Sequence, residues 1–203
     1  MSETKLTTED KIREAALKIF KQKGFDGTSV QDIANEAGTT KSMVNYYFRT
    51  KEKLFSEIYL NQHKNLHEGI GTFILSLAPL KEKIEKIVAW DIDKISEIPD
   101  VPIFILTEVH HNPEIIFKNM QSMNVAIGMS ILNMQIKAEA ALGKIRVVEA
   151  RDLILNIQAL TIFPFLGKPL LMKTFSMDEK GFNEMLQQRK KEIPEIIWNW
   201  MKI

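Results

Sequence analysis

Cysteine is missing from the 203-residue chain. Its absence excludes disulfide bonds, thiolate zinc sites and cysteine nucleophiles, and it is typical of an intracellular protein. The charges almost cancel, because 27 Lys and Arg residues face 26 Asp and Glu residues. The chain therefore has no overall basic field to attract a nucleic acid, and any such binding must depend on a local patch of cations.

Long apolar runs are missing as well. The first ten residues, MSETKLTTED, lack the apolar core of a signal peptide. The longest uncharged run, residues 119–136, carries several Asn, Gln and Ser side chains. A membrane span needs about 20 predominantly apolar residues, so we expect no membrane segment and a cytoplasmic location.

Proline and glycine are scarce, with 7 and 9 residues, and apolar residues recur at helical spacing almost throughout. The chain is therefore predicted to be all-α. Thr28–Gln31 and Ser176–Glu179 have the spacing of capping boxes, and Pro194 should kink or divide the last helix. The expected helices cover about residues 8–23, 28–37, 40–47, a long segment after Thr50, 80–96, 101–109, 113–142, 147–163 and 178–201.

The stretch TTKSMVNYYFRTKEKLF, residues 39–55, places aromatic and cationic residues side by side. Two short helices joined by a turn at Gly38 predict a helix-turn-helix. On the second of them, Val44 and Phe48 face inward, and the outer residues can bond phosphates or base edges. Eight residues of helix span roughly 12 Å, close to the width of a major groove. The outer residues are Thr40, Lys41, Ser42, Asn45 and Tyr46.

The segment FDGTSVQDIANEAGTTKSMVNYYFRTKEKLF resembles the DNA-binding signature of the tetracycline-repressor (TetR) family of bacterial transcription regulators. The shared features are a Thr-Ser pair, then Ile-Ala and Ala-Gly before the turn, and Tyr-Tyr-Phe followed by a lysine. The close resemblance covers about the first 55 residues; beyond them it is one of length and helix order.

The resemblance implies an all-helical fold in two parts. Residues 1–48 would form the helix-turn-helix DNA-binding domain, and residues 49–203 a larger helical regulatory and dimerisation domain. The implied function is a homodimeric repressor that binds a palindromic operator on double-stranded DNA and is released by a small, largely apolar ligand.

The family's DNA contacts can be transferred to matching positions. Asn45 stands where the family most often has tyrosine; because asparagine can read adenine through two hydrogen bonds, we expect an altered preferred sequence. Tyr47 has an alternative role in packing against the first helix. The implied contacts are Thr28 or Ser29 at a phosphate, Thr40, Lys41 and Ser42 at the groove entry, Tyr46 and Tyr47 at sugar-phosphate, and Lys51 at another phosphate.

The part after Pro79 is expected to supply the dimer interface and the ligand site. The apolar stripes of the last two long helices are predicted to form a four-helix interface. Those stripes are Leu153, Ile157, Leu160 and Thr161 on one helix, and Phe182, Met185, Leu186, Ile193, Ile197 and Trp200 on the other. The predicted ligand site contains Trp90, Phe104, His110, Met120, Met123, Asn124, Gln158 and Phe163, with a solid core as the alternative.

Two other classes of function were weighed. A helical interaction module would bind other proteins and show no affinity for DNA, which a gel shift would reveal. An enzyme is not expected, because the chain has no nucleophile elbow, phosphate loop or paired carboxylates in a glycine-rich setting. His63 and His67 have the spacing of a two-histidine metal site but no evident third ligand, so no metal or cofactor is predicted.

Overall fold

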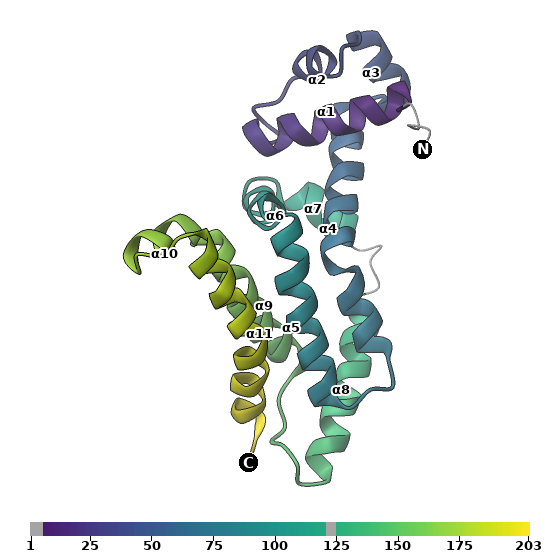
Figure 1. Ribbon diagram of the computed structural model, residues 1–203. Helices are drawn as coiled ribbons and strands as arrows, with labels where there is room; N and C mark the ends of the chain where they lie inside the picture. The colour runs from purple at the N-terminus through teal and green to yellow at the C-terminus, as the bar shows by residue number, and fades with distance from the viewer. Residues whose placement is uncertain (1–5, 121–124) are drawn as a thin grey trace, which may run out of the picture. The chain divides into compact units, whose positions relative to one another are not determined.

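The computed structural model describes residues 6–120 and 125–203, and every regular element in this part of the chain is a helix (Figure 1). The prediction of an all-α fold is therefore confirmed. The helices are α1 (Thr8–Lys23), α2 (Val30–Glu36), α3 (Lys41–Phe48), α4 (Lys51–Leu75), α5 (Leu80–Glu97), α6 (Asp100–His111), α7 (Pro113–Met120), α8 (Val125–Ala141), α9 (Ala150–Leu166), α10 (Lys168–Thr174) and α11 (Glu179–Met201).

The chain divides into two compact units. Unit 1 consists of residues 1–65 and 103–123, and unit 2 consists of residues 66–102 and 124–203. The predicted boundary at residue 48 separates a DNA-binding domain from the rest of the chain, and it stays a prediction. Among the described residues no single helix is long and apolar enough to cross a membrane, although α9 and α10 pass on length and composition as a pair bent by 71°.

The core of unit 1 is built from the inward faces of α1 to α4. Val44 and Phe48 of α3 are buried as predicted. Aromatic rings join α1 and the loop after it to α4, because the ring of Phe55 lies 5.1 Å from that of Phe20 and 4.8 Å from that of Phe25. Phe104 of α6 completes this cluster at 6.3 Å from Phe55. Unit 1 therefore contains part of α6 as well as the helix-turn-helix.

Two predicted capping boxes are wrong. The cap of α2 is Ser29, whose side chain accepts from the backbone N–H of Asp32, while Asp32 accepts from the N–H of Ser29. Thr28 cannot take this role because its side chain is buried. The cap of α11 is Asp178, not Ser176. In both places the helix begins one or two residues later than the sequence pattern indicated.

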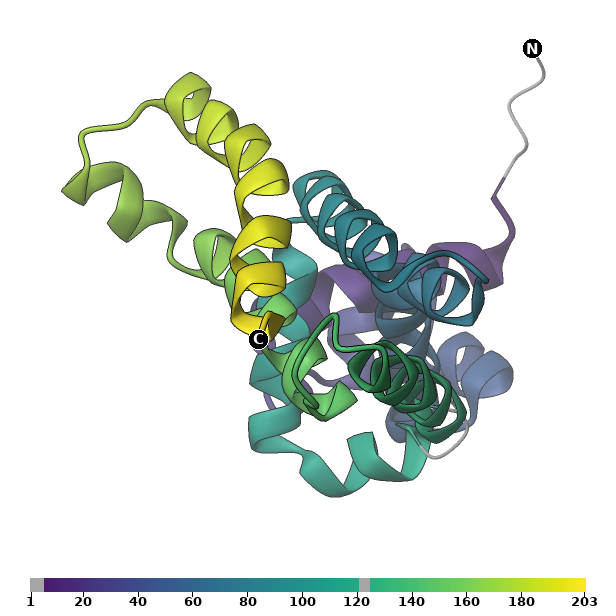
Figure 2. The same cartoon turned by 90° about the horizontal axis from the view of Figure 1, so that it is seen from below.

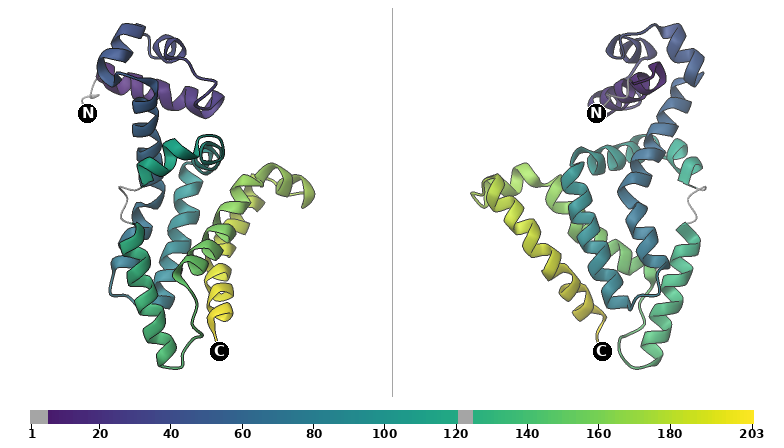
Figure 3. Two further views of the ribbon diagram at one scale, coloured as in Figure 1. Left: turned by 180° about the vertical axis from the view of Figure 1, so that it is seen from behind. Right: turned by 45° about the vertical axis from the view of Figure 1, so that its right-hand side comes forward.

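In unit 2, α5 packs against both α9 and α11, and α8 and α10 pack against α9 (Figures 2 and 3). The buried faces are almost entirely aliphatic, with Phe182 as the large aromatic side chain of the core. One buried lysine closes the turn between α4 and α5: the Nζ of Lys83 donates to the carbonyl of Ile74 at 2.7 Å. Burial lowers the pKa of Lys83, and the charge of Glu139 opposes that shift.

Prolines lie inside both α9 and α11. Because Pro164 has no N–H, it leaves the carbonyl of Leu160 without its usual helical donor. Arg189 of α11 supplies a donor instead, at 2.7 Å from that carbonyl. Of the two effects predicted for Pro194, a kink or a division of the last helix, the division is wrong, since α11 continues through Pro194 to Met201. The short helix α10 was not predicted.

Candidate nucleic-acid interface

The outer face of α3 is polar and exposed, as its helical spacing requires. Thr40 caps the helix by accepting from the N–H of Met43, and Val44 and Phe48 hold the opposite face in the core. The phenol of Tyr46 is 75% exposed and that of Tyr47 36%, and their rings meet edge to face at 5.2 Å. The predicted contact residues Thr40, Lys41, Ser42, Asn45, Tyr46 and Tyr47 are all exposed together on this one helix.

The start of α2 differs from what the DNA contacts would require. The hydroxyl of Thr28 is buried and donates to the carbonyl of Gly24 at 2.6 Å. The N–H of Ser29 donates to Asp32 at 2.9 Å. Lys23 and then Ser29 hydrogen-bond to the Asp32 carboxylate and hold its pKa well below the usual range. The donors expected to meet a phosphate are therefore engaged within the chain, and such a contact would need Ser29 to change partners.

Lys51 lies at the start of α4 and faces the loop between α1 and α2. Its ammonium donates to the carbonyls of Phe25 and Thr28, each at 2.9 Å, and sits 4.2 Å from the centre of the Phe25 ring. An ammonium group has three donors, so these two bonds use most of its capacity. Lys51 thus shapes the loop that precedes the helix-turn-helix, a role that its position in the sequence does not reveal.

Glu108 of α6 reaches the same loop and was missed by the sequence reasoning. Its side chain is 2% exposed, and one carboxylate oxygen accepts from the N–H of Phe25 at 3.1 Å. The other oxygen accepts from the side-chain amide of Asn112 at 3.0 Å. Burial, and next the charge of Glu108, raise the pKa of the Tyr59 hydroxyl to about 12. Because Glu108 is 83 residues from Phe25, no local pattern signals this contact.

The residues predicted to form a ligand site are divided between the units. Phe104 and His110 belong to unit 1, where Phe104 is buried in the aromatic cluster and His110 lies beside His111. Trp90, Gln158 and Phe163 belong to unit 2. Met123 and Asn124, and the side chain of Met120, lie outside the described residues.

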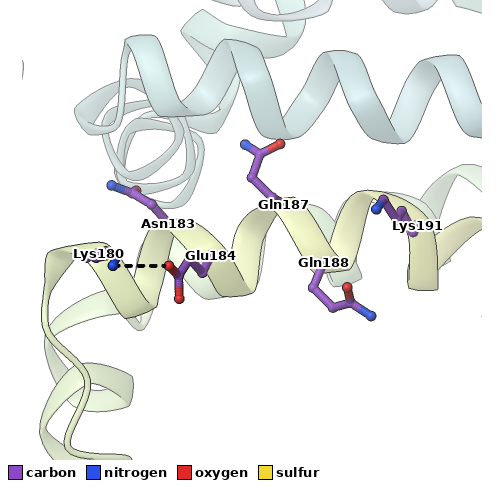
Figure 4. A pocket seen from close by; sticks show the side chains of 6 residues that line it. All are labelled: Lys180, Asn183, Glu184, Gln187, Gln188 and Lys191. Carbon is purple, nitrogen blue, oxygen red and sulfur yellow. Dashed lines mark ion pairs between the residues drawn. The ribbon is translucent and has the colours of Figure 1, made fainter.

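Two surface hollows in the described part of the chain contain no residue of the predicted ligand site. One is lined by Arg146, Val147, Val148, Glu149, Asp152 and Trp200. The other runs along α11 and is open, and all six of its lining residues are polar or charged residues of that one helix (Figure 4). Its lining residues are Lys180, Asn183, Glu184, Gln187, Gln188 and Lys191.

Gln158 takes part in a buried polar cluster in the core of unit 2. Its amide donates to Asp91 of α5 at 2.7 Å, and the hydroxyl of Thr161 donates to the same oxygen at 3.0 Å. Burial raises the pKa of Asp91 to about 7, although these two hydrogen bonds act in the opposite direction. Among the residues that the structure describes, no group of three metal-ligating side chains comes together.

The stripes predicted for the dimer interface face mainly into their own subunit. Leu153, Ile157 and Thr161 of α9 are buried, as are Phe182, Leu186, Ile193 and Ile197 of α11. These seven side chains are covered within their own subunit, and the prediction that the two stripes form the dimer interface stays a prediction. The opposite face of α9 remains uncovered: Leu155 is 66% exposed, Phe163 58% and Leu166 37%.

The fold and this surface define a class: an all-helical protein with a helix-turn-helix near its N-terminus. Residues 12–58 match the model of the family described as bacterial regulatory proteins, tetR family. The chain is 30% identical over 104 residues to the HTH-type transcriptional repressor NicS of Pseudomonas putida, a match that covers 51% of this chain and 49% of NicS. The chain thus spans about half the length of this curated relative.

Two solved structures share the fold over most of the chain. The TetR family transcriptional regulator PfmR of Thermus thermophilus has a TM-score of 0.61 at 22% identity and covers 92% of this chain and 98% of its own. The structure of AibR in complex with isovaleryl coenzyme A and operator DNA has a TM-score of 0.61 at 17% identity, over 78% of this chain and 86% of its own. Residues 12–58 thus match the DNA-binding segment of the TetR family, and the solved structures show the same fold over most of the chain. This family is one of transcription regulators and not of enzymes.

Proposed function

We propose that this protein is a transcriptional repressor that binds a palindromic operator through α3. The observation that carries the proposal is the outer face of α3, where Lys41, Ser42, Asn45 and Tyr46 stand exposed over a core anchored by Phe48. Cations position such a helix on phosphates, and amide or hydroxyl groups read base edges. The similarity to NicS, a transcriptional repressor, agrees with this proposal.

Selection of genomic DNA fragments by the purified full-length protein, followed by sequencing, tests the proposal directly. We expect a two-fold symmetric motif with half-sites about 34 Å apart, or a multiple of that distance. The affinity for the selected fragment should fall steeply with salt, because phosphate contacts release counterions. Lys41→Ala should reduce that salt dependence. Failure to enrich any sequence would favour a helical interaction module without DNA binding.

A dimer is part of the proposal, because one short helix reads too few bases to be selective in a genome. The exposed side of α9 offers a face for it: Leu155, Phe163 and Leu166 lie at positions i, i+8 and i+11, on one side of the helix. Exposed apolar stripes of this kind mark association surfaces.

Phe163→Asp places a charge in the middle of the exposed stripe on α9 and should yield a monomer that binds the operator weakly. Gln187→Asp on the polar side of α11 is the matched control, since it adds the same charge where polar residues already lie. Light scattering at micromolar concentration separates the two variants. A dimer that persists in Phe163→Asp would place the interface elsewhere.

The last part of the proposed function is control of operator binding by a small, largely apolar ligand. The observation that favours it is the polar cluster of Asp91, Gln158 and Thr161 within the aliphatic core of unit 2, since ligand sites combine apolar walls with a few polar groups. A ligand would have to open this packed core. A panel of hydrophobic compounds should contain one that raises the melting temperature and weakens operator binding; if none does both, the ligand proposal fails.

A further inference from the structure

We propose that Glu108 of α6 is a positioning residue for DNA binding, because its carboxylate holds the loop from which the helix-turn-helix begins. The inference rests on the proposed DNA-binding function and adds to it a residue outside the DNA-binding surface. It concerns contacts within unit 1 only, between α6 and the loop that joins α1 to α2.

The loop is held at one residue by two opposite charges. Glu108 accepts from the N–H of Phe25 at 3.1 Å, and Lys51 donates to the carbonyl of Phe25 at 2.9 Å. Glu108 and Phe25 are both buried, so water does not compete effectively for these bonds. The position of Phe25 is thereby fixed from α6 on one side and from α4 on the other.

The carboxylate approaches the backbone so closely that a side chain at position 24 would be crowded against it. A Cβ added at Gly24 would lie 3.2 Å from the Glu108 oxygen that accepts from Phe25, and Gly24 has a φ of +69°. Glycine is the residue that adopts this conformation without strain. Gly24 and Glu108 are therefore matched to each other in this structure, although they lie far apart in the sequence.

Fixing Phe25 fixes the start of α2. The N–H of Thr28 donates to the carbonyl of Phe25 at 3.3 Å, and Lys51 binds the carbonyl of Thr28 at 2.9 Å. The next residue, Ser29, is the cap of α2, and α2 packs against α3. Removal of the Glu108 carboxylate should therefore let α2 and α3 adopt several orientations, and DNA would have to select one of them.

A purely space-filling role does not account for an acid here. Burial of a carboxylate is unfavourable unless it is fully hydrogen-bonded, and a well-packed apolar residue often gives equal or greater stability. The direction of the electrostatic effect also separates the two roles. DNA is a polyanion, so removal of a negative charge should leave binding unchanged or strengthen it. Positioning predicts the opposite result.

The test compares Glu108→Ala, Glu108→Gln and Glu114→Gln in the full-length protein with two DNA probes, the fragment selected by the wild-type protein and a scrambled version of it. Glu114 is exposed on α7 and serves as the control for charge. We expect Glu108→Ala to weaken binding of the selected fragment about 10- to 150-fold, the effect of losing one hydrogen bond to a charged group, with a smaller loss on scrambled DNA. Glu108→Gln keeps an acceptor for Phe25 and should recover most of the affinity, and Glu114→Gln should bind at least as tightly as the wild type.

Amide hydrogen exchange at Phe25 gives a readout that does not involve DNA. The amide should be protected in the wild type and in Glu108→Gln, and exchange much faster in Glu108→Ala. If Glu108→Ala does not fold, the comparison is made with the wild type and Glu108→Gln alone. A Phe25 amide that is unprotected in both would overturn the hydrogen bond between Phe25 and Glu108. Wild-type affinity in Glu108→Ala, or equal losses on both probes, would overturn the positioning role. A wild-type protein that binds no fragment would instead refute the proposed function.

Discussion

Gly69→Ala is expected to destabilise unit 2, although alanine favours a helix more than glycine does. The added Cβ would lie 2.3, 2.5 and 2.6 Å from three ring atoms of Trp90. The indole is not free to move away, because its N–H donates to the carbonyl of Leu66 at 3.1 Å and its ring lies edge to face with Phe73 at 6.2 Å. The glycine therefore makes the notch in α4 that the indole fills.

The sign of the effect follows from two magnitudes. Glycine to alanine within a helix stabilises by about 1 kcal/mol, whereas overpacking of a core costs about 1–3 kcal/mol. If the indole shifts, its hydrogen bond is lost as well, at about 1 kcal/mol. We expect Gly69→Ala to lower the free energy of unfolding by about 1–2 kcal/mol, which for a chain of this size is a melting temperature lower by roughly 2–8 °C.

Gly71 provides the matched control on the same helix. It is exposed, and a Cβ added there would meet nothing within 4 Å. Gly71→Ala should therefore raise the free energy of unfolding by up to about 1 kcal/mol. Urea unfolding monitored by tryptophan fluorescence reports the unfolding of unit 2 in both variants, since all three tryptophans lie in unit 2. Equal stabilisation by the two substitutions would refute the reasoning.

Three further predictions concern single residues. The pKa of Asp91 is raised from 3.8 to about 7, so the native carboxyl keeps a proton that the unfolded chain has lost, and stability should fall as pH rises through that range. Asp91→Asn should flatten this pH dependence. The change in free energy of unfolding from wild type to variant, measured by thermal unfolding, should be more favourable at pH 8 than at pH 4 by more than about 1 kcal/mol. Asn45→Ala should cost about 1–3 kcal/mol at one base pair of the operator, and equal losses on specific and random DNA would show that it reads no base. Because Lys51 holds the same loop as Glu108, Lys51→Ala should weaken binding of the selected fragment more than that of scrambled DNA and reduce stability by about 1–3 kcal/mol. Unchanged stability would show that its bonds to the loop carbonyls contribute little.

The sequence predicted local features better than distant ones. The inward face of α3, with Val44 and Phe48, follows from helical periodicity and was predicted correctly. The sequence did not reveal what the apolar stripe of α11 packs against. Phe182 and Leu186 would show the same spacing whether they packed on α5 or on a second subunit. Periodicity identifies an apolar face but not what covers it.

The site shows the same division between local and distant information. Thr40 was recognised as the start of α3 from neighbouring residues, and the structure has it as the cap. Lys51 was expected at a phosphate, yet its ammonium lies on the carbonyl of Phe25, 26 residues away. Glu108 gave no signal at all, because a buried acid in a helix looks like a solvated one until its partner is known.

The hydrogen bond from Arg189 to the carbonyl of Leu160 constrains how this sequence can evolve. Arg189 donates to that carbonyl because Pro164 does not, so the two residues are tolerated as a pair. Loss of Arg189 alone leaves a partly buried acceptor unpaired, whereas loss after Pro164 has become alanine leaves the acceptor with a helical N–H. The order of the two mutations thus decides whether the intermediate is harmful. A double-mutant cycle should reveal this epistasis as a smaller effect of Arg189→Ala in the Pro164→Ala background.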